Sequence, residues 1–335
     1  MQIDGQNVTA STVFLLGAGF SVDAATAAGN PIFDGRRVRY PLVADLLEPC
    51  FGLKSLPPQR SIEQLFQASI DSGDHGPTER LYDQVMEADY NIAQRLRPDG
   101  SHPDNIYLRF FRDFATEPLL TFNYDSLVEL LLLGLRRWRP EDGYGIRVQS
   151  QLAPVDPSTV AEQSVRCVLH LHGSLCVYPE SSYIEHRPGN EFDMLRRRND
   201  PIFLFDPDAL GHCFFPFEGI SPGHSYAHVA ERAIAPVPDK AEGLNGEFIK
   251  AMYQRAKAAV RSADQFVVIG YSFNPHDRAS YEALLAAAEE LTVVLVGPDA
   301  SHLAPRMREV YPRLRWQEVS SSFRDWVQQG YQGAV

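Results

Sequence analysis

Four large apolar residues run directly into a glycine turn near the start of the chain, and this junction limits the folds that the chain can adopt. Val13, Phe14, Leu15 and Leu16 have no polar residue among them and are followed by Gly17-Ala18-Gly19. Such an uninterrupted apolar run is typical of a strand buried on both faces, as in a parallel sheet. The glycines permit a tight turn, and the alanine-rich segment that follows favours a helix. This segment therefore predicts the first strand-turn-helix unit of an α/β fold.

The N-terminus of that helix is a candidate anion site. Free backbone N–H groups and the positive end of the helix dipole both favour a phosphate. The candidate cradle consists of Gly17, Ala18, Gly19, Phe20 and Ser21, with the Ser21 hydroxyl as an extra donor. The usual dinucleotide fingerprint has a third glycine where this chain has Val22. A tight turn without a ligand is therefore an equally good interpretation of this segment alone.

Net charge and cysteine spacing narrow the classes of partner. The chain has 335 residues and a formal net charge of -12, which disfavours direct binding along a nucleic-acid backbone. Arginine clusters at 36–39, 136–139 and 196–198 are interpreted as solvated surface or helix-end charge. No pair among the four cysteines is separated by two residues, so neither a zinc ribbon nor a redox pair is predicted.

The N-terminal segment and the hydropathy pattern indicate a cytoplasmic protein. The first residues are polar, unlike the basic and then apolar segments of an export signal. The longest apolar run, at 130–133, is too short to cross a bilayer. We therefore expect reduced thiols, a cytoplasmic location and no membrane association.

The order of expected elements predicts a doubly wound, mostly parallel sheet with helices between its strands. Strands are expected at 13–16, 118–121, 165–171, 265–269 and 291–296, and helices at 41–50, 78–97, 103–114, 126–138, 247–262 and 275–290. A capping box at Ser61-Ile62-Glu63-Gln64 predicts another helix start. We expect one domain over 1–335, with a helical insertion at 36–115 and an irregular insertion at 176–246.

Polar turns follow most of these strands. They lie at 17–23, 121–125, 170–174 and 270–277, and ligands of such sheets bind beyond the carboxyl ends of the strands. In the strand expected at 165–171, alternation predicts that Arg166, Val168, His170 and His172 share one side. We therefore expect the four turns to meet at one crevice, with a histidine beside it.

In this order, the motifs GAGFS (17–21), TFNYD (121–125), HLHGS (170–174) and GYSFNPHD (270–277) resemble the sirtuin superfamily. The closer resemblance is to the bacterial sirtuin-like NAD hydrolases of antiphage defence. It covers the sheet region and implies a Rossmann-like core that binds NAD as a substrate. Protein deacylases of the superfamily carry two Cys-x-x-Cys pairs between the histidine and the Gly-x-Ser motif, where this chain has only Cys176 and Cys213. The resemblance therefore implies no structural zinc and disfavours deacylation.

The resemblance also implies roles for individual residues. His172 corresponds to the catalytic histidine, which deprotonates a ribose hydroxyl or a water, and Asn123 corresponds to the asparagine that orients the ribose and the water. Further NAD contacts are expected at Gly17, Ala18, Gly19, Phe20, Ser21, Asp125, Gly270, Ser272 and Asp277.

Each of these residues also has a purely structural interpretation. His172 could be a hydrogen-bonded strand histidine, and Asn123 could cap the apolar helix that follows it. Gly270 could end a strand, and Asp125 and Asp277 could favour helix N-termini. His224 and His228, four residues apart with Glu231 three further on, are a weak metal signal because no His-Glu-x-x-His pattern is present.

The resulting functional hypothesis is an NAD+ glycohydrolase that releases nicotinamide and ADP-ribose as an antiphage defence effector. The resemblance implies control by homo-oligomerisation or by a partner such as a helicase-type ATPase or an Argonaute-type protein. A non-hydrolytic sensor of NAD or ADP-ribose is the main alternative, and an NAD-dependent protein deacylase is a weaker one.

Overall fold

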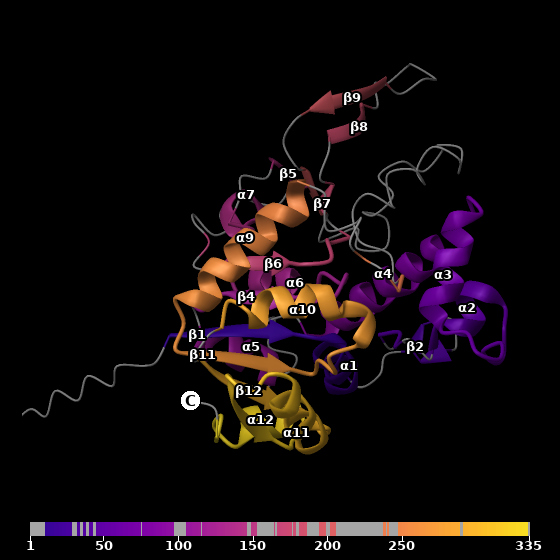
Figure 1. Ribbon diagram of the computed structural model, residues 1–335. Helices are drawn as coiled ribbons and strands as arrows, with labels where there is room; N and C mark the ends of the chain where they lie inside the picture. Colours follow the sequence, from indigo (N-terminus) through magenta and orange to yellow (C-terminus); the bar gives the residue numbers. More distant parts are fainter. Residues whose placement is uncertain are drawn as a thin grey trace, which may run out of the picture.

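The computed structural model shows a six-stranded parallel sheet covered by helices (Figure 1). It describes residues 11–28, 32–33, 36–37, 40–42, 45–74, 76–96, 105–114, 116–145, 149–152, 164, 166–175, 177–178, 181–185, 194–198, 202–205, 237–238, 240, 247–288 and 291–333. The expected site residues all lie within these ranges. Both His224 and His228 lie outside them.

Six strands form the main sheet, and all of their pairings are parallel. The strands are β1 (Thr12–Leu16), β4 (Leu119–Thr121), β6 (Val168–His170), β11 (Gln265–Ile269), β12 (Thr292–Val296) and β13 (Arg315–Val319). Their order in space is β13-β12-β11-β1-β4-β6. The prediction of a doubly wound parallel sheet is therefore confirmed.

The strand order reverses beside β1, at the centre of the sheet. The chain moves outward from β1 through β4 to β6, and then returns to place β11 on the other side of β1. This is the arrangement of the Rossmann-like folds, whose ligands bind at the carboxyl ends of the strands that flank the reversal. In this chain those ends carry Gly17 after β1 and Gly270 after β11.

Helices cover both faces of the sheet. One connected group contains α1 (Ala18–Ala27), α5 (Ile106–Asp113), α6 (Leu127–Gly134) and α12 (Phe323–Gln328). The other contains α9 (Glu247–Arg261) and α10 (Arg278–Leu285), which pass in front of the strands in Figure 1. Right-handed crossovers in opposite directions from the centre put the two groups on opposite faces.

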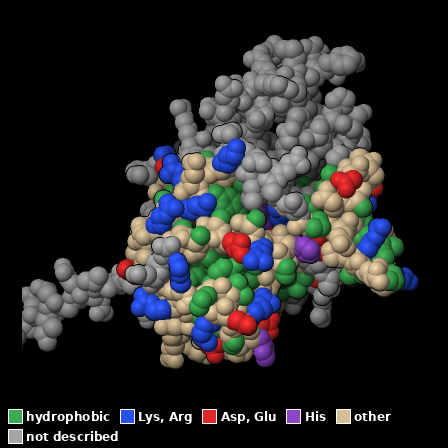
Figure 2. All heavy atoms as spheres, viewed as in Figure 1, with side chains coloured by type: hydrophobic (Ala, Val, Ile, Leu, Met, Phe, Trp, Pro, Cys, Tyr) green, Lys and Arg blue, Asp and Glu red, His purple; other side chains and the backbone are tan. Residues whose placement is uncertain are grey.

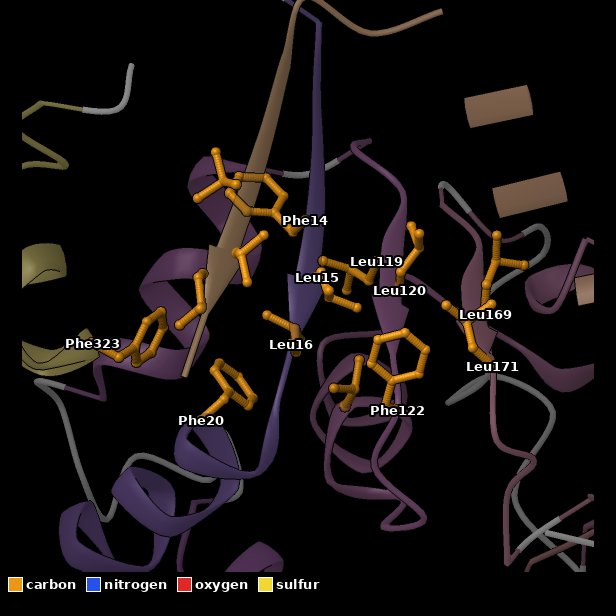
Figure 3. Close-up of a cluster of buried hydrophobic side chains, with 14 of the residues drawn as sticks. Phe14, Leu15, Leu16, Phe20, Leu119, Leu120, Phe122, Leu169, Leu171 and Phe323 are labelled. Atoms are coloured by element: carbon orange, nitrogen blue, oxygen red, sulfur yellow. The ribbon is translucent and has the colours of Figure 1, made fainter. Parts of the chain in front are cut away.

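An aromatic core fixes the first group of helices to β1. Phe14 and Phe20 are fully buried, and their rings pack edge-to-face against Phe110 and Phe323 respectively. Figure 3 shows Phe20 and Phe323 on the side of β1 where Leu16 lies, away from Leu169 of β6. Burying each phenyl ring contributes about 2–3 kcal/mol. The cost of misplacing the turn after β1 is therefore high, because Phe20 belongs to that turn.

Four described helices lie between α1 and β4 in the chain: α2 (Leu47–Phe51), α3 (Ile62–Asp71), α4 (Gly76–Leu96) and α5. The capping box at Ser61 is confirmed, since the Ser61 hydroxyl accepts from Gln64 N and the Gln64 side chain accepts from Ser61 N. The helix expected at 41–50 is shorter than predicted and ends at Gly52, whose φ of 68° is left-handed. These helices occupy the interval where the sequence predicted a helical insertion.

Two helices and one strand are shorter than the sequence predicted. The helix expected at 126–138 ends at Gly134, after which Arg136 adopts a φ of 56°. The helix expected at 275–290 starts with a 3-10 turn, η4 (Pro275–Asp277), and continues as α10 only to Leu285. The strand expected at 165–171 is β6, which ends at His170.

Short strands just before β6 and between β6 and α9 form separate small sheets. β5 (Gln149–Leu152), β10 (Ile202–Phe205) and β7 (Val177–Tyr178) form one, and β8 (Ser181–Glu185) and β9 (Met194–Arg198) form another. The expectation that residues 176–246 lack regular structure is therefore wrong for β7, β8, β9 and β10. Extended pairing without a clear apolar period explains why the pattern did not predict them.

The described surface carries charges of both signs. Figure 2 shows lysine and arginine side chains in separate groups among acidic and apolar ones on the face in view. None of the described helices is both long enough and apolar enough to span a bilayer.

Gly270→Ala is expected to lower the free energy of unfolding by about 2–4 kcal/mol. A Cβ at Gly270 would lie 2.5 Å from Phe20 N and 2.8 Å from Gly19 C, and its φ is +62°. Gly297→Ala is the matched control, because a Cβ there has nothing within 4 Å. Urea unfolding measures both variants, and equal losses would contradict the close-approach explanation.

Candidate functional site

The turn after β1 packs directly on the backbone that follows β11. A Cβ on Gly17 would lie 2.5 Å from Gly270 O, and one on Gly19 would lie 2.9 Å from both Gly270 Cα and O. Only glycine permits this approach, so these glycines are required by backbone packing at the reversal of strand order. The sequence pattern left two interpretations of these glycines open, a phosphate cradle and a tight turn without a ligand.

Three of the five amides expected to cradle a phosphate are already bonded to protein carbonyls. Gly17 N donates to Ile269 O at 2.9 Å, Gly19 N to Gly270 O at 2.9 Å, and Phe20 N to Gly17 O at 3.0 Å. Phe20 also has its ring in the core. The exposed part of the turn is Ala18 and Gly19. A ligand on this turn would therefore meet its outer surface.

The Asn123 carboxamide joins the turn after β4 to the turn after β1. Its Nδ2 donates to Gly17 O at 3.1 Å and to Ser21 Oγ at 3.0 Å. The Asn123 backbone N–H donates to Thr121 Oγ1 at 2.9 Å. Because both amide hydrogens are directed to protein atoms, Oδ1 is the acceptor that remains for a ligand or a water. Asn123 does not cap α6, whose N-cap is Ser126.

Asp125 lies behind this amide and is buried. Its Oδ2 accepts from Ser21 Oγ at 2.8 Å, and its Oδ1 accepts from Leu127 N at 3.3 Å in the first turn of α6. Burial raises the pKa of Asp125 from its ordinary 3.8 to about 6. Ser21 therefore donates its hydroxyl hydrogen to Asp125 instead of to a phosphate.

A second buried carboxylate, Asp89, reaches the same place from α4. Its Oδ2 accepts from Ser126 N at 2.7 Å and from Ser126 Oγ at 2.8 Å, and its Oδ1 accepts from the Tyr40 hydroxyl. Burial, reinforced by the charge of Asp125, raises the pKa of Asp89 well above its ordinary value. The helices before β4 are therefore bonded to the loop that carries Asn123.

His172, the expected base, lies in the turn after β6. Its Nε2 is 3.0 Å from Ser280 Oγ of α10, and its ring packs on Phe122 at a centroid distance of 4.7 Å. The side chain is buried, with 2% of its surface exposed. Burial, and then the charge of Lys240, lower the pKa of His172 well below 6.5. The ring is neutral at pH 7 and able to accept a proton.

His170 and His172 do not share one side, contrary to the sequence prediction. His170 contacts Glu129 of α6, whereas His172 contacts Ser280 of α10 on the opposite face. Alternation applies only within a strand, and β6 ends at His170.

The turn after β11 closes the other side of the site. The Tyr271 ring packs on Phe122 at 5.0 Å, and its hydroxyl donates to Asp277 Oδ2 at 3.1 Å. Asp277 is also paired with Lys240, so its carboxylate is neutralised from within the chain. Ser272 is exposed, and its carbonyl accepts from Arg306 at 3.2 Å.

The four turns expected to meet do lie together. Asn123 contacts the turn after β1, Tyr271 joins the turn after β11 to Phe122, and Phe122 packs on His172. Sequence reasoning missed Asp89, Glu129, Lys240 and Ser280. Only Asp89 had a signal, because it falls on the apolar stripe of α4 beside Leu81, Tyr82, Val85, Ala88 and Ile92.

Within the described residues, no group of three or more His, Cys, Asp and Glu side chains is placed to hold a metal ion. Cys50 and Cys167 are free thiols. Cys176 and Cys213 lie outside the described residues.

The sheet and its strand order define a Rossmann-like α/β protein. No protein-family model matches the chain, and no curated protein matches it either. The chain is similar to the structure of a Sir2 homologue in complex with NAD, with 15% identity, 95% of this chain and 87% of that chain covered, and a TM-score of 0.39.

Two further solved structures are similar to the same extent. A mutant Sir2 homologue in complex with ADP-ribose has 16% identity, covers 95% of this chain and 89% of that chain, and has a TM-score of 0.38. Sir2 with a p53 peptide and NAD+ has 13% identity, covers 96% and 92%, and has a TM-score of 0.38. At this level of similarity, the site is interpreted from its own geometry.

Asp125→Asn is expected to stabilise the protein at pH 7.5 by about 1–3 kcal/mol. The folded-state pKa of Asp125 is raised, so its contribution to stability is fully present below pH 3.8 and is lost as the pH rises through about 6. The asparagine does not titrate, and the gain should vanish near pH 4. Urea unfolding at both pH values measures it, with the exposed Asp299→Asn as control. A gain that is independent of pH would contradict the expectation.

Proposed function

We propose that this protein hydrolyses NAD+ at the bond between nicotinamide and ribose. The observation that supports the proposal is that a neutral imidazole, packed on Phe122, and an oriented carboxamide, on the residue after Phe122, lie on neighbouring turns at the carboxyl edge of the sheet. His172 and Asn123 are also the residues that correspond to the catalytic pair in the sirtuin-like motifs.

The reaction needs few protein groups, because nicotinamide is a good leaving group. The C1′–N bond breaks, its electron pair leaves with neutral nicotinamide, and an oxocarbenium-like carbon remains. A water oxygen forms the new bond to C1′ and loses a proton to the base. The products are ADP-ribose, nicotinamide and one proton.

The chain offers a group for each remaining task. His172, neutral at pH 7 and held by Ser280, accepts the proton. Asn123 Oδ1 accepts a hydrogen bond from the attacking water or a ribose hydroxyl, while its Nδ2 is fixed on Gly17 O and Ser21 Oγ. Ala18 and Gly19, the exposed part of the first turn, meet the diphosphate at the N-terminus of α1.

The described conformation suits an enzyme at rest. His172 is almost completely buried, and Lys240 and Asp277 are paired beside it. Continuous hydrolysis of a central cofactor would harm the cell that makes the enzyme. Because the motifs of this chain resemble those of the bacterial sirtuin-like NAD hydrolases, we place the activity in antiphage defence. There, oligomerisation or a helicase-type or Argonaute-type partner opens the site, and the enzyme then depletes NAD.

A non-hydrolytic sensor of NAD or ADP-ribose is the second candidate function. The burial of His172 favours this function. If the imidazole never contacts a water molecule, the protein can bind NAD but cannot hydrolyse it. The backbone amides of the turn after β1 that are bonded to protein carbonyls also favour a sensor, because they make the binding surface rigid. Nicotinamide release separates the two functions.

Nicotinamide release from NAD+ is expected to fall at least about 100-fold in His172→Ala and in Asn123→Ala. Both variants should elute from a sizing column at the same volume as the wild type and unfold at similar urea concentrations. His302→Ala, an exposed histidine on α11 (Ala300–Val310), is the matched control and should keep full activity.

The assay should include the protein co-expressed with the products of its neighbouring genes, because a resting enzyme is silent alone. NAD+ binding without nicotinamide release under all of these conditions would overturn hydrolysis in favour of the sensor.

The acid limb of kcat/KM is expected below pH 6.5. A base works only when deprotonated, and burial together with Lys240 lowers the pKa of His172 well below that value. Removing the positive charge with Lys240→Gln should move the limb to higher pH. Initial rates between pH 4.5 and 8.5 measure the acid limb of the wild type and of the Lys240→Gln variant. A wild-type acid limb above pH 7 would contradict His172 as the base.

A further inference from the structure

A second histidine, outside the expected catalytic set, is bonded to the backbone of Asn123. His170 is fully buried, and its Nδ1 donates to the carbonyl oxygen of Asn123 at 3.1 Å. Its Nε2 lies 2.6 Å from Glu129 Oε1, and Tyr144 donates its hydroxyl hydrogen to the same oxygen at 3.0 Å. One ring thus connects α6 to the peptide that carries the carboxamide.

We propose that His170 and Glu129 are positioning residues for Asn123 in the proposed hydrolysis. Glu129 fixes the plane and the protonation of the imidazole, and Nδ1–H then holds the Asn123 carbonyl. With the Asn123 N–H on Thr121 Oγ1 and Nδ2 on Gly17 O, the peptide and the side chain are fixed at three points. The remaining acceptor, Oδ1, keeps one direction toward the ligand.

The pair is a poor choice for stability alone. Glu129 is 1% exposed, and no donor among the described residues reaches its Oε2. Burying a carboxylate with an unbonded oxygen is costly, and apolar side chains of similar volume are often no less stable in such places. The geometric restraint on Asn123 explains why the site contains these residues.

Four charged or titratable groups determine the charge on His170. Burial alone would lower its pKa, but Glu129, the hydrogen bond to the Asn123 carbonyl and Asp125 together raise it above 6.5. Asp89 acts on the same cluster through Asp125, and Tyr144 bonds Glu129. Both ring nitrogens of His170 face acceptors, the Asn123 carbonyl and Glu129 Oε1, which favours the protonated ring. His172, two residues later, is neutral and has the separate role of base.

The experiment compares two double variants that differ only in the donor to Asn123. In His170→Asn/Glu129→Gln, the carboxamide introduced at position 170 can replace Nδ1–H, whereas His170→Leu/Glu129→Gln has no donor there. In both, the carboxamide oxygen introduced at position 129 still accepts from Tyr144. Nicotinamide release should show kcat within about threefold of wild type for the first and at least about tenfold lower for the second, with similar KM.

A binding measurement keeps the positioning role testable if hydrolysis itself fails. Nitrogen-15 spectra report the Asn123 side-chain amide, identified by its loss in Asn123→Ala. The chemical shifts and the slow hydrogen exchange of this amide should be unchanged in His170→Asn/Glu129→Gln. In His170→Leu/Glu129→Gln, the shifts should change and the exchange should become fast. Urea unfolding confirms that both variants are folded. Equal kcat values, or unchanged Asn123 signals in the folded leucine variant, would overturn the proposal.

If the wild type releases no nicotinamide even when it is co-expressed with the products of its neighbouring genes, the proposed function fails, and the amide signals still decide whether the pair positions Asn123.

Discussion

Direct backbone contact between Gly17, Gly19 and Gly270 determines where everything else in the site can lie. These residues follow the two strands that flank the reversal of strand order, and side chains would hold their backbones apart. Asn123 is bonded to one side of this contact, through Gly17 O, and Tyr271 extends from the other. The backbone contact thus fills the centre of the carboxyl edge of the sheet. A ligand would lie on the outer surface of the contacting turns.

Buried charge is concentrated at the N-terminus of α6. Asp89, Asp125 and Glu129 surround its first turn, and the His170 ring contacts Glu129. Backbone donors at Ser126 and Leu127, together with the helix dipole, offset part of the repulsion. The raised pKa values of Asp89 and Asp125 show that the compensation is incomplete. These buried carboxylates lower the stability of the protein next to the loop that positions the Asn123 carboxamide. Such a local loss of stability is common at functional sites.

Local patterns predicted the parts of the fold that depend on neighbours in sequence. The apolar run of β1, the glycine turn and the capping box at Ser61 each need only a few consecutive residues, and each is present. The order of four turns also predicted which strands end at the site. Helix ends were less predictable, because Arg136 and Gly52 stop helices through left-handed backbone conformations.

The remaining site residues depend on contacts between distant segments. Ser280 meets His172 across 108 positions, and Glu129 meets His170 across 41, so no spacing rule connects them. The alternation rule failed at His172 because the strand ends two residues earlier. The glycine turn was predicted from the sequence, but its packing partner, Gly270, lies 253 positions after Gly17 and could not be identified from the local pattern.

The central place of β1 has a consequence for synthesis. Ser11, just before β1, bonds Asp264, 253 positions later, so one edge of the strand has no neighbour until β11 is made. At translation rates of about 5–20 residues per second, that edge waits for roughly 10 to 50 s. The nascent chain must shield an apolar strand for this interval. The same delay keeps the crevice from being assembled on an unfinished polypeptide.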